Sequence, residues 1–211
     1  MLYFVKTPGW MKKVYPSRVW DFPGKHKQLY LSFDDGPHPL HTPQVLDILQ
    51  EFTAKATFFC IGKNVMEHPV VYRRIIEEGH AVGNHTHNHL NGWKVDDGIY
   101  LDNVHQAKQF IDTDLFRPPY GRASTFQVRQ LMQPKYRLKT IMWSVLSGDF
   151  DTKLSPEECL QNVLLNARDG SIIVFHDSEK AQERMLFALP AVLKYFTERG
   201  FSFEKIPRQL T

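Results

Sequence analysis

The chain has few cysteines, no long apolar run and no dense basic block, and each absence excludes a class of protein. Its two cysteines, Cys60 and Cys159, lie in different segments and cannot form a disulfide framework, so we expect two free thiols. No apolar run approaches the length of a membrane span. A net charge of +3 over 211 residues does not indicate a nucleic-acid partner.

The start of the chain also lacks the features of a signal peptide. Residues Met1–Lys6 contain neither a basic leader nor an apolar core of sufficient length, so we expect a cytoplasmic protein unless a leader has been removed. Trp10, Trp20 and several prolines predict that residues 1–28 form an extended segment packed on a single domain of residues 29–211. Nothing in these segments indicates a protein partner.

Short apolar runs alternate with amphipathic stretches along the chain. The runs predicted to form buried strands are 28–33, 56–61, 80–83, 114–117, 139–145, 171–176 and 201–206. The stretches predicted to form helices are 42–53, 68–78, 99–112, 124–134, 155–168 and 180–199. We found no internal repeat, linker or low-complexity tract that would divide this alternation.

Capping residues mark several helix boundaries. Ser155 precedes a proline and is followed three residues later by Glu158, which predicts an N-terminal capping box, and Thr42 precedes a proline in the same way. Pro190 predicts a kink or a break in the last helix. The glycines expected to close helices in the left-handed conformation are Gly79, Gly170 and Gly200.

Seven strands that alternate with helices imply an α/β fold whose parallel sheet is covered on its faces. An open doubly wound sheet and a barrel both fit this alternation. The candidate functional residues, however, follow the carboxyl ends of the first, third, fourth, fifth and sixth strands. An open sheet would spread those ends along a line, whereas a barrel gathers them over one mouth. We therefore predict an incomplete (β/α) barrel with seven strands.

Two histidines four residues apart suggest a metal site. In a helical turn, this spacing places His85 and His89 on one face of the helix, while His87 points elsewhere. A histidine-rich polar turn at a strand end would have the same sequence. The segment is not the H-E-x-x-H motif of zinc proteases, because Thr86 occupies the glutamate position.

Asp34 and Asp35 supply the carboxylates. Two adjacent carboxylates at the end of an apolar strand are costly unless a positive charge lies nearby, and a divalent cation is such a charge. A simple Asp-Gly turn is the alternative for these residues in isolation. Two imidazoles and one carboxylate suit Zn²⁺, with Co²⁺, Ni²⁺ or Fe²⁺ as other choices. Such an ion lowers the pKa of a bound water to about 7.

Four segments together resemble the polysaccharide deacetylases with a NodB homology domain, the family-four carbohydrate esterases. These segments are Phe33-Asp34-Asp35-Gly36-Pro37, His85-Thr86-His87-Asn88-His89, Arg117-Pro118-Pro119-Tyr120-Gly121 and Val174-Phe175-His176. They occur in the order typical of the family, and the resemblance spans about residues 29 to 206. It implies a distorted (β/α)7 barrel, which agrees with the strand count.

The resemblance also implies roles for individual residues. Asp35 is similar to the carboxylate ligand, Asp34 to the general base and His176 to the general acid. A histidine that donates a proton needs a raised pKa, and we expect Asp149 to raise that of His176. Arg117 resembles the arginine that holds the base carboxylate in place and keeps it ionised.

In the same family, the backbone N–H at the position of Tyr120 helps to bind the oxyanion. The chain departs from the family pattern at Leu146, Phe150 and Val174, where an aspartate, a tryptophan and a leucine are usual. These departures concern the groove wall and therefore the choice of substrate. The aromatic residues that could line the groove, or equally lie in the core or at the rim, are Trp93, Tyr120, Trp143 and Phe150.

We therefore expect a metal-dependent hydrolase that removes acetyl groups from the N-acetylated sugars of a polysaccharide or peptidoglycan-like glycan. An O-acetyl esterase acting on xylan or another acetylated glycan would use the same residues. An inactive glycan-binding barrel is a third possibility. A non-haem iron oxygenase also uses two histidines and a carboxylate, but the ligand order and the β/α alternation argue against it.

Overall fold

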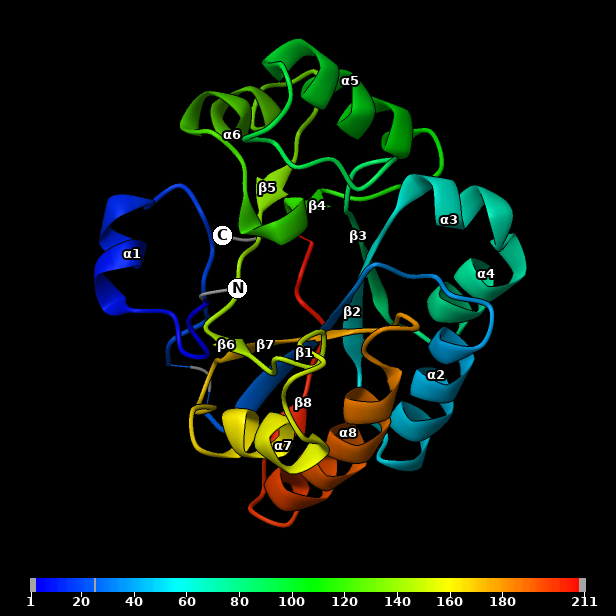
Figure 1. The fold of residues 1–211 in the computed structure, drawn as a ribbon, viewed down its shortest axis with the longest axis vertical. Helices are drawn as coiled ribbons and strands as arrows, with labels where there is room; N and C mark the ends of the chain where they lie inside the picture. The colour runs from blue at the N-terminus through cyan, green and yellow to red at the C-terminus, as the bar shows by residue number, and fades with distance from the viewer. Residues whose placement is uncertain (1–2, 25, 209–211) are drawn as a thin grey trace.

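A computed structural model describes residues 3–24 and 26–208 of the chain (Figure 1). The strands are β1 (Gln28–Asp34), β2 (Ala56–Cys60), β3 (Ala81–Asn84), β4 (Leu115–Phe116), β5 (Lys139–Thr140), β6 (Val145–Leu146), β7 (Ile172–His176) and β8 (Ser202–Phe203). The helices are α1 (Gly9–Val14), α2 (His41–Glu51), α3 (Gly62–Glu67), α4 (Pro69–Glu77), α5 (Asp97–Lys108), α6 (Thr125–Leu131), α7 (Pro156–Leu164) and α8 (Gln182–Thr197), with a 3-10 turn η1 (Pro119–Gly121).

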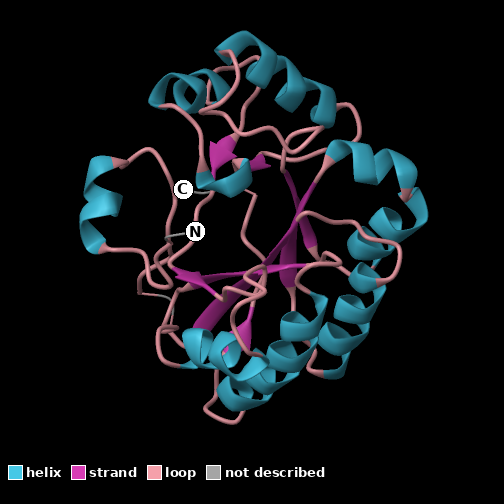
Figure 2. Cartoon of the chain, viewed as in Figure 1, coloured by secondary structure: helices cyan, strands magenta, loops and turns pink. Residues whose placement is uncertain are grey.

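The strands form one parallel, curled sheet in the order β5-β4-β3-β2-β1-β7-β6, and helices surround its outer face (Figure 2). The last strand, β8, pairs with the beginning of β1 only. This arrangement is the predicted incomplete barrel. Its two edge strands, β5 and β6, are consecutive in the chain but are not paired with each other.

The predicted strand 139–145 is wrong as a single element. Residues 139–140 belong to one edge of the sheet and residues 145–146 to the other, so the chain between them crosses the open side of the barrel. There its backbone bonds with an earlier segment instead: the Met142 N–H donates to the Val19 carbonyl over 2.7 Å. A run of apolar residues indicates burial but not the strand with which it pairs.

Several helix predictions also needed correction. The predicted helix 68–78 is preceded by a separate short helix, α3, which the apolar pattern did not indicate. Helix α2 begins at His41, and the Thr42 hydroxyl accepts the His38 N–H (2.7 Å) rather than acting as the N-cap of α2. Pro190 does not divide α8, because packing of its buried face on the sheet outweighs one lost hydrogen bond.

The segment 1–28 is not wholly extended, since it contains helix α1. Three other expectations hold. The capping box at Ser155 is present, and both cysteines are free and buried. The three glycines predicted to close helices all have positive φ, and these are Gly79 (φ 80°), Gly170 (φ 74°) and Gly200 (φ 77°).

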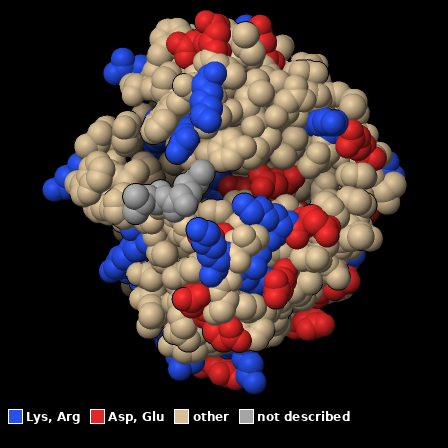
Figure 3. Space-filling model, in the orientation of Figure 1, with Lys and Arg blue, Asp and Glu red and all other residues tan. Residues whose placement is uncertain are grey.

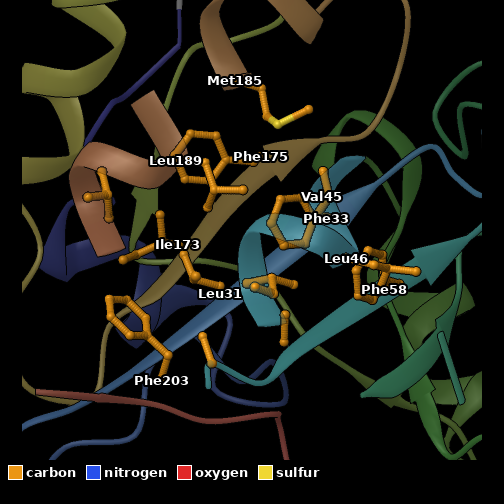
Figure 4. Close-up of a cluster of buried hydrophobic side chains, with 14 of the residues drawn as sticks. Leu31, Phe33, Val45, Leu46, Phe58, Ile173, Phe175, Met185, Leu189 and Phe203 are labelled. Carbon is orange, nitrogen blue, oxygen red and sulfur yellow. The ribbon is translucent and has the colours of Figure 1, made fainter. Parts of the chain in front are cut away.

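The core forms between the sheet and the helices α2, α7 and α8. Leu31 and Phe33 of β1 pack with Phe175 of β7 against the buried faces of α2 and α8 (Figure 4). Successive side chains of a strand point to opposite faces, so Ser32 and Asp34 point into the barrel instead. Each buried leucine or phenylalanine contributes about 1.5–3 kcal/mol. The alternation therefore places apolar side chains on the outer face of the sheet, where they pack on the helices, and polar side chains on its inner face, in the barrel.

Among the described residues, no helix combines the length and apolarity that a bilayer span requires. Figure 3 shows lysine and arginine side chains distributed among acidic ones over one face of the molecule.

Candidate active site

The carboxyl ends of β1, β3 and β7 meet at one mouth of the barrel. Asp34 is paired in register with His176 on the neighbouring strand β7, and Asp35 follows directly. The His85 N–H donates to the Cys60 carbonyl (2.9 Å), which attaches the loop after β3 to the end of β2. A cavity of about 720 Å³ opens over these ends. The predicted residues that line it are Asp34, Asp35, His85, His89, Tyr120 and His176.

Asp35, His85 and His89 form a cluster whose potential ligand atoms all lie within 4.8 Å of one another. The Oδ1 atom of Asp35 lies 3.5 Å from Nε2 of His85 and 3.1 Å from Nε2 of His89. Burial favours the neutral form of Asp35, but hydrogen bonds from the two imidazoles and nearby charges hold its pKa well below the ordinary value. The carboxylate is therefore ionised and available to a cation.

The orientation of His85 is informative about what occupies this cluster. Its Nδ1 lies 2.8 Å from the carbonyl oxygen of Arg117, so Nδ1 carries the proton and donates. When Nε2 is also protonated it donates to the carboxylate of Asp35, and in the neutral imidazole it presents a lone pair that a metal ion can bind. A second imidazole nitrogen that donates to a carbonyl is typical of metal-bound histidines. The residues present thus fit a divalent ion.

The histidine segment is not the helical turn that its spacing suggested. Thr86 (φ 64°) and His89 (φ 55°) adopt left-handed conformations, so the chain loops back and brings both imidazoles to the same side. Asp35 also has a positive φ (80°). Non-glycine residues in this region cost about 1–3 kcal/mol each and are typical of functional sites. His87 points away, as expected, and stacks on Phe110 with 5.7 Å between ring centroids.

Arg117 is fully buried and pairs with Asp34. Its Nη1 donates to Asp34 Oδ1 (2.7 Å) and to the Ser32 hydroxyl (2.8 Å). Its other nitrogens donate to the carbonyls of Ile141 (3.2 Å) and Met142 (2.9 Å). Burial lowers the pKa of Arg117 and the Asp34 carboxylate opposes this effect, so the guanidinium stays charged. Asp34 is thereby held in one orientation at the floor of the cavity.

His176 and Asp149 form the second pair, as predicted. The imidazole Nδ1 donates to Asp149 Oδ1 (2.8 Å), and the His176 backbone N–H donates to Oδ2 (2.7 Å). Burial disfavours the imidazolium, but the charge and hydrogen bond of Asp149, with smaller contributions from Asp35 and Asp34, raise the pKa of His176 to about 10. The buried Arg184 donates to the Asp149 carbonyl (2.7 Å) and fixes the loop that carries this carboxylate.

The cavity wall is only partly as predicted. Trp143 and Phe150 line the cavity, together with Tyr120, whose ring lies 4.7 Å from that of His89 and whose φ is 60°. Trp93 does not line the cavity, and its side chain is largely exposed beside Arg122. An aromatic residue in a sequence can indicate either burial in the core or stacking on a ligand. Only the fold shows which of these residues line the cavity and which lie at its rim.

Asp177 is a residue of the site that was not predicted from the sequence. Its carboxyl is buried, lines the cavity and accepts the Thr42 hydroxyl through Oδ2, while Oδ1 has no hydrogen-bond partner among the described residues. Burial, with the charges of Asp35 and Asp34, raises the pKa of Asp177 to about 7. The signal was available, because Asp177 extends a buried strand as the first two aspartates do.

A second group of possible ligands comprises His38, His41 and Glu179, beside the mouth. His41 Nε2 lies 2.8 Å from Glu179 Oε2. The Nδ1 atom of His38, however, accepts the backbone N–H groups of Leu40 (3.2 Å) and His41 (3.3 Å). In the neutral imidazole the proton is therefore on Nε2, which faces Glu179 as a donor and offers no lone pair to a metal. The donor set fits a metal poorly.

Comparisons with known proteins agree with this geometry. A family model described as polysaccharide deacetylase matches residues 22–137. A peptidoglycan-N-acetylglucosamine deacetylase of Bacillus cereus is 32% identical over 198 residues, which cover 91% of this chain and 92% of the relative. A chitooligosaccharide deacetylase of Azorhizobium caulinodans is 35% identical over 199 residues, which cover 85% of this chain and 92% of the relative.

Among solved structures, the chain is similar to the crystal structure of a peptidoglycan N-acetylglucosamine deacetylase. The two superpose with a TM-score of 0.83 and 28% sequence identity, over 95% of each chain. The similarity thus covers nearly the whole chain.

Proposed function

The chain belongs to the polysaccharide deacetylase family, and on this premise we propose that it removes acetyl groups from the N-acetylated sugars of a glycan of the peptidoglycan or chitin type. The observation that carries the proposal is the placement of two separate charged pairs around one cluster of ligands. Asp34 with Arg117 and His176 with Asp149 lie at neighbouring strand ends beside Asp35. Amide hydrolysis needs such a base and such an acid together.

Asp35, His85 and His89 would hold the divalent ion on which deacetylases of this family depend, with Zn²⁺ the best match to the donor set. When bound, the ion polarises the acetyl carbonyl and lowers the pKa of a water molecule beside it. The lone pair of His85 is aimed at that position because its other nitrogen donates to the Arg117 carbonyl.

Asp34 would accept the proton of the attacking water. The guanidinium of Arg117 holds one carboxylate oxygen of this buried base and leaves the other for the water. The backbone N–H of Tyr120, at the cavity wall, would bind the oxyanion that develops on the carbonyl. Since this role belongs to the backbone, Tyr120→Phe should reduce activity less than Arg117→Ala.

His176 would donate a proton to the leaving nitrogen. An amide anion is too basic to leave unaided, so the acid must be protonated at working pH. The pairing with Asp149 supplies this condition through the raised pKa of the imidazole. An acetate ester has a better leaving group and needs the acid less. The buried His176–Asp149 pair therefore favours an N-acetyl substrate over the O-acetyl substrates of an esterase.

The experiment is to measure acetate release from chitin oligosaccharides and peptidoglycan fragments before and after treatment with a chelator. We expect activity that is lost with the metal and restored by Zn²⁺. Unchanged activity in the stripped protein would reject the metal-dependent mechanism. Tight glycan binding without acetate release at any tested metal would instead support an inactive binding barrel.

Acetylated xylan serves as the comparison substrate for ester hydrolysis, with His176→Ala as the diagnostic variant. We expect the variant to lose at least about 100-fold more of the amide rate than of the ester rate, the size typical of general acid catalysis. Equal losses on both substrates would favour an O-acetyl esterase.

A further inference from the structure

The open side of the barrel is covered by the beginning of the chain. Lys6 forms an antiparallel bridge with Val145 of the edge strand β6, and the Leu146 N–H donates to the Val5 carbonyl (2.8 Å). The Thr7 N–H donates to the Ser144 carbonyl (3.0 Å). In Figure 1, this segment and α1 lie on the side of the barrel between β5 and β6. Residues 5–7 thus act as an additional edge strand.

This pairing places Tyr3 directly behind the cavity wall. The Tyr3 ring lies 5.1 Å from the ring of Phe150, and its hydroxyl donates to Asp151 Oδ2 (3.2 Å). Burial and the neighbouring Asp151 raise the pKa of Tyr3 to about 12, so the hydroxyl remains a donor. Gly148, in the same loop, has φ 81°, and a Cβ there would lie 3.1 Å from the Tyr3 hydroxyl. The Tyr3 hydroxyl therefore lies close to both Gly148 and Asp151.

The residues that Tyr3 touches are in direct contact with the second charged pair. Phe150 packs edge-on against the imidazole of His176, with 5.2 Å between centroids and an interplanar angle of 71°. Asp149, which precedes it, holds that imidazole. The loop is fastened from the helix side by Arg184, which donates to the Asp149 carbonyl (2.7 Å). Besides His176, the Tyr3 ring is the other aromatic contact described for Phe150.

We propose that Tyr3 is a positioning residue for proton donation: by supporting Phe150 and the Asp149 loop, it holds the His176 imidazole in place and shields it from water. The inference rests on the proposed deacetylase function. An ion pair at the edge of a cavity weakens as water reaches it, and small displacements of a catalytic group are costly. A supporting aromatic ring limits both.

The test compares Tyr3→Ala and Tyr3→Phe with wild type, using an N-acetylated chitooligosaccharide and nitrophenyl acetate as substrates. Nitrophenolate is a good leaving group and needs no proton from His176. The rate on this ester therefore reports on the other catalytic residues alone. We expect Tyr3→Ala to lower kcat on the amide by at least about tenfold and on the ester by less than about twofold. Tyr3→Phe keeps the ring and should lose about threefold on the amide only.

Phe4→Ala is the matched control, because Phe4 is adjacent but 58% exposed. Phe4→Ala should leave both rates within about twofold of wild type, because substitutions of exposed residues usually have small effects. If Tyr3→Ala does not unfold cooperatively and is therefore misfolded, the rates of Tyr3→Phe are used to test the inference. An amide-to-ester ratio that is the same in the folded Tyr3 variants as in Phe4→Ala overturns the inference.

A readout independent of turnover separates this inference from the proposed function. In protein treated with a chelator to remove metal, the side-chain NMR signals of His176 should shift or broaden in Tyr3→Ala and not in Phe4→Ala. A wild-type protein without any deacetylase activity would reject the proposed function. Unchanged His176 signals would reject the positioning role of Tyr3 even if the enzyme were active.

Discussion

Replacing Arg117 by methionine should destabilise the protein more than any surface substitution. The side chain is fully buried, and Asp34, its partner, is 4% exposed. Removing one partner of a buried ion pair leaves an uncompensated charge and costs about 3–5 kcal/mol. The two carbonyls of Ile141 and Met142 also lose a donor, which adds roughly 1 kcal/mol where water cannot enter. We expect a loss of at least about 4 kcal/mol.

The size of this loss matters because domains are only marginally stable, by about 5–15 kcal/mol. The assay is urea unfolding at neutral pH of protein from which metal has been removed with a chelator, so that metal binding does not contribute. Arg73→Met on α4 is the control, since Arg73 is exposed. Arg117→Lys keeps the charge but not the planar fork and should lie between wild type and Arg117→Met.

The double variant Asp34→Asn/Arg117→Met completes the test. Because the buried charge is then gone, it should be more stable than Arg117→Met alone, with a coupling of about 1–3 kcal/mol. Two results would refute the reasoning. One is a loss below about 1 kcal/mol for Arg117→Met, the size of an ordinary surface change. The other is a double variant that is no more stable than the single one.

Three other perturbations test separate parts of the site. Saturation with Zn²⁺ at about 100 times its Kd should stabilise the protein by about 2.7 kcal/mol, or 5–10 °C in Tm, and His89→Ala should abolish that shift in calorimetry. Because the His176 pKa is raised to about 10, its pairing with Asp149 stabilises the fold fully below pH 6.5 and less as the pH rises through 10. In unfolding experiments at different pH values, the stability difference between wild type and Asp149→Asn should therefore shrink across that window. A constant difference would contradict the prediction. In Gly36→Ala the new Cβ would lie 2.1 Å from the buried Asp177 carboxylate, so we expect a loss of about 1–3 kcal/mol that Gly36→Ala/Asp177→Ala partly recovers in thermal melts.

The strands and most helices were predictable because their signals are local. The run that ends at Asp34 is mostly apolar and buried from Leu29 onward, as expected of a central parallel strand, and the capping box at Ser155 is closed by residues three apart. The two halves of the predicted strand 139–145 were not separable in this way. The residues that connect them bond with Thr7 and Val19, which come from the far end of the sequence.

The sequence by itself determined which side chains are candidates for the chemistry and which strand ends present them, because residue type and position after an apolar run are local properties. Only the tertiary structure decided how these side chains are oriented and supported. The lone pair of His85 is set by a carbonyl 32 residues away, and the His176 imidazole is held by Asp149 and, through Phe150, supported by Tyr3. Such contacts depend on where the sheet closes, and closure is a property of the whole chain.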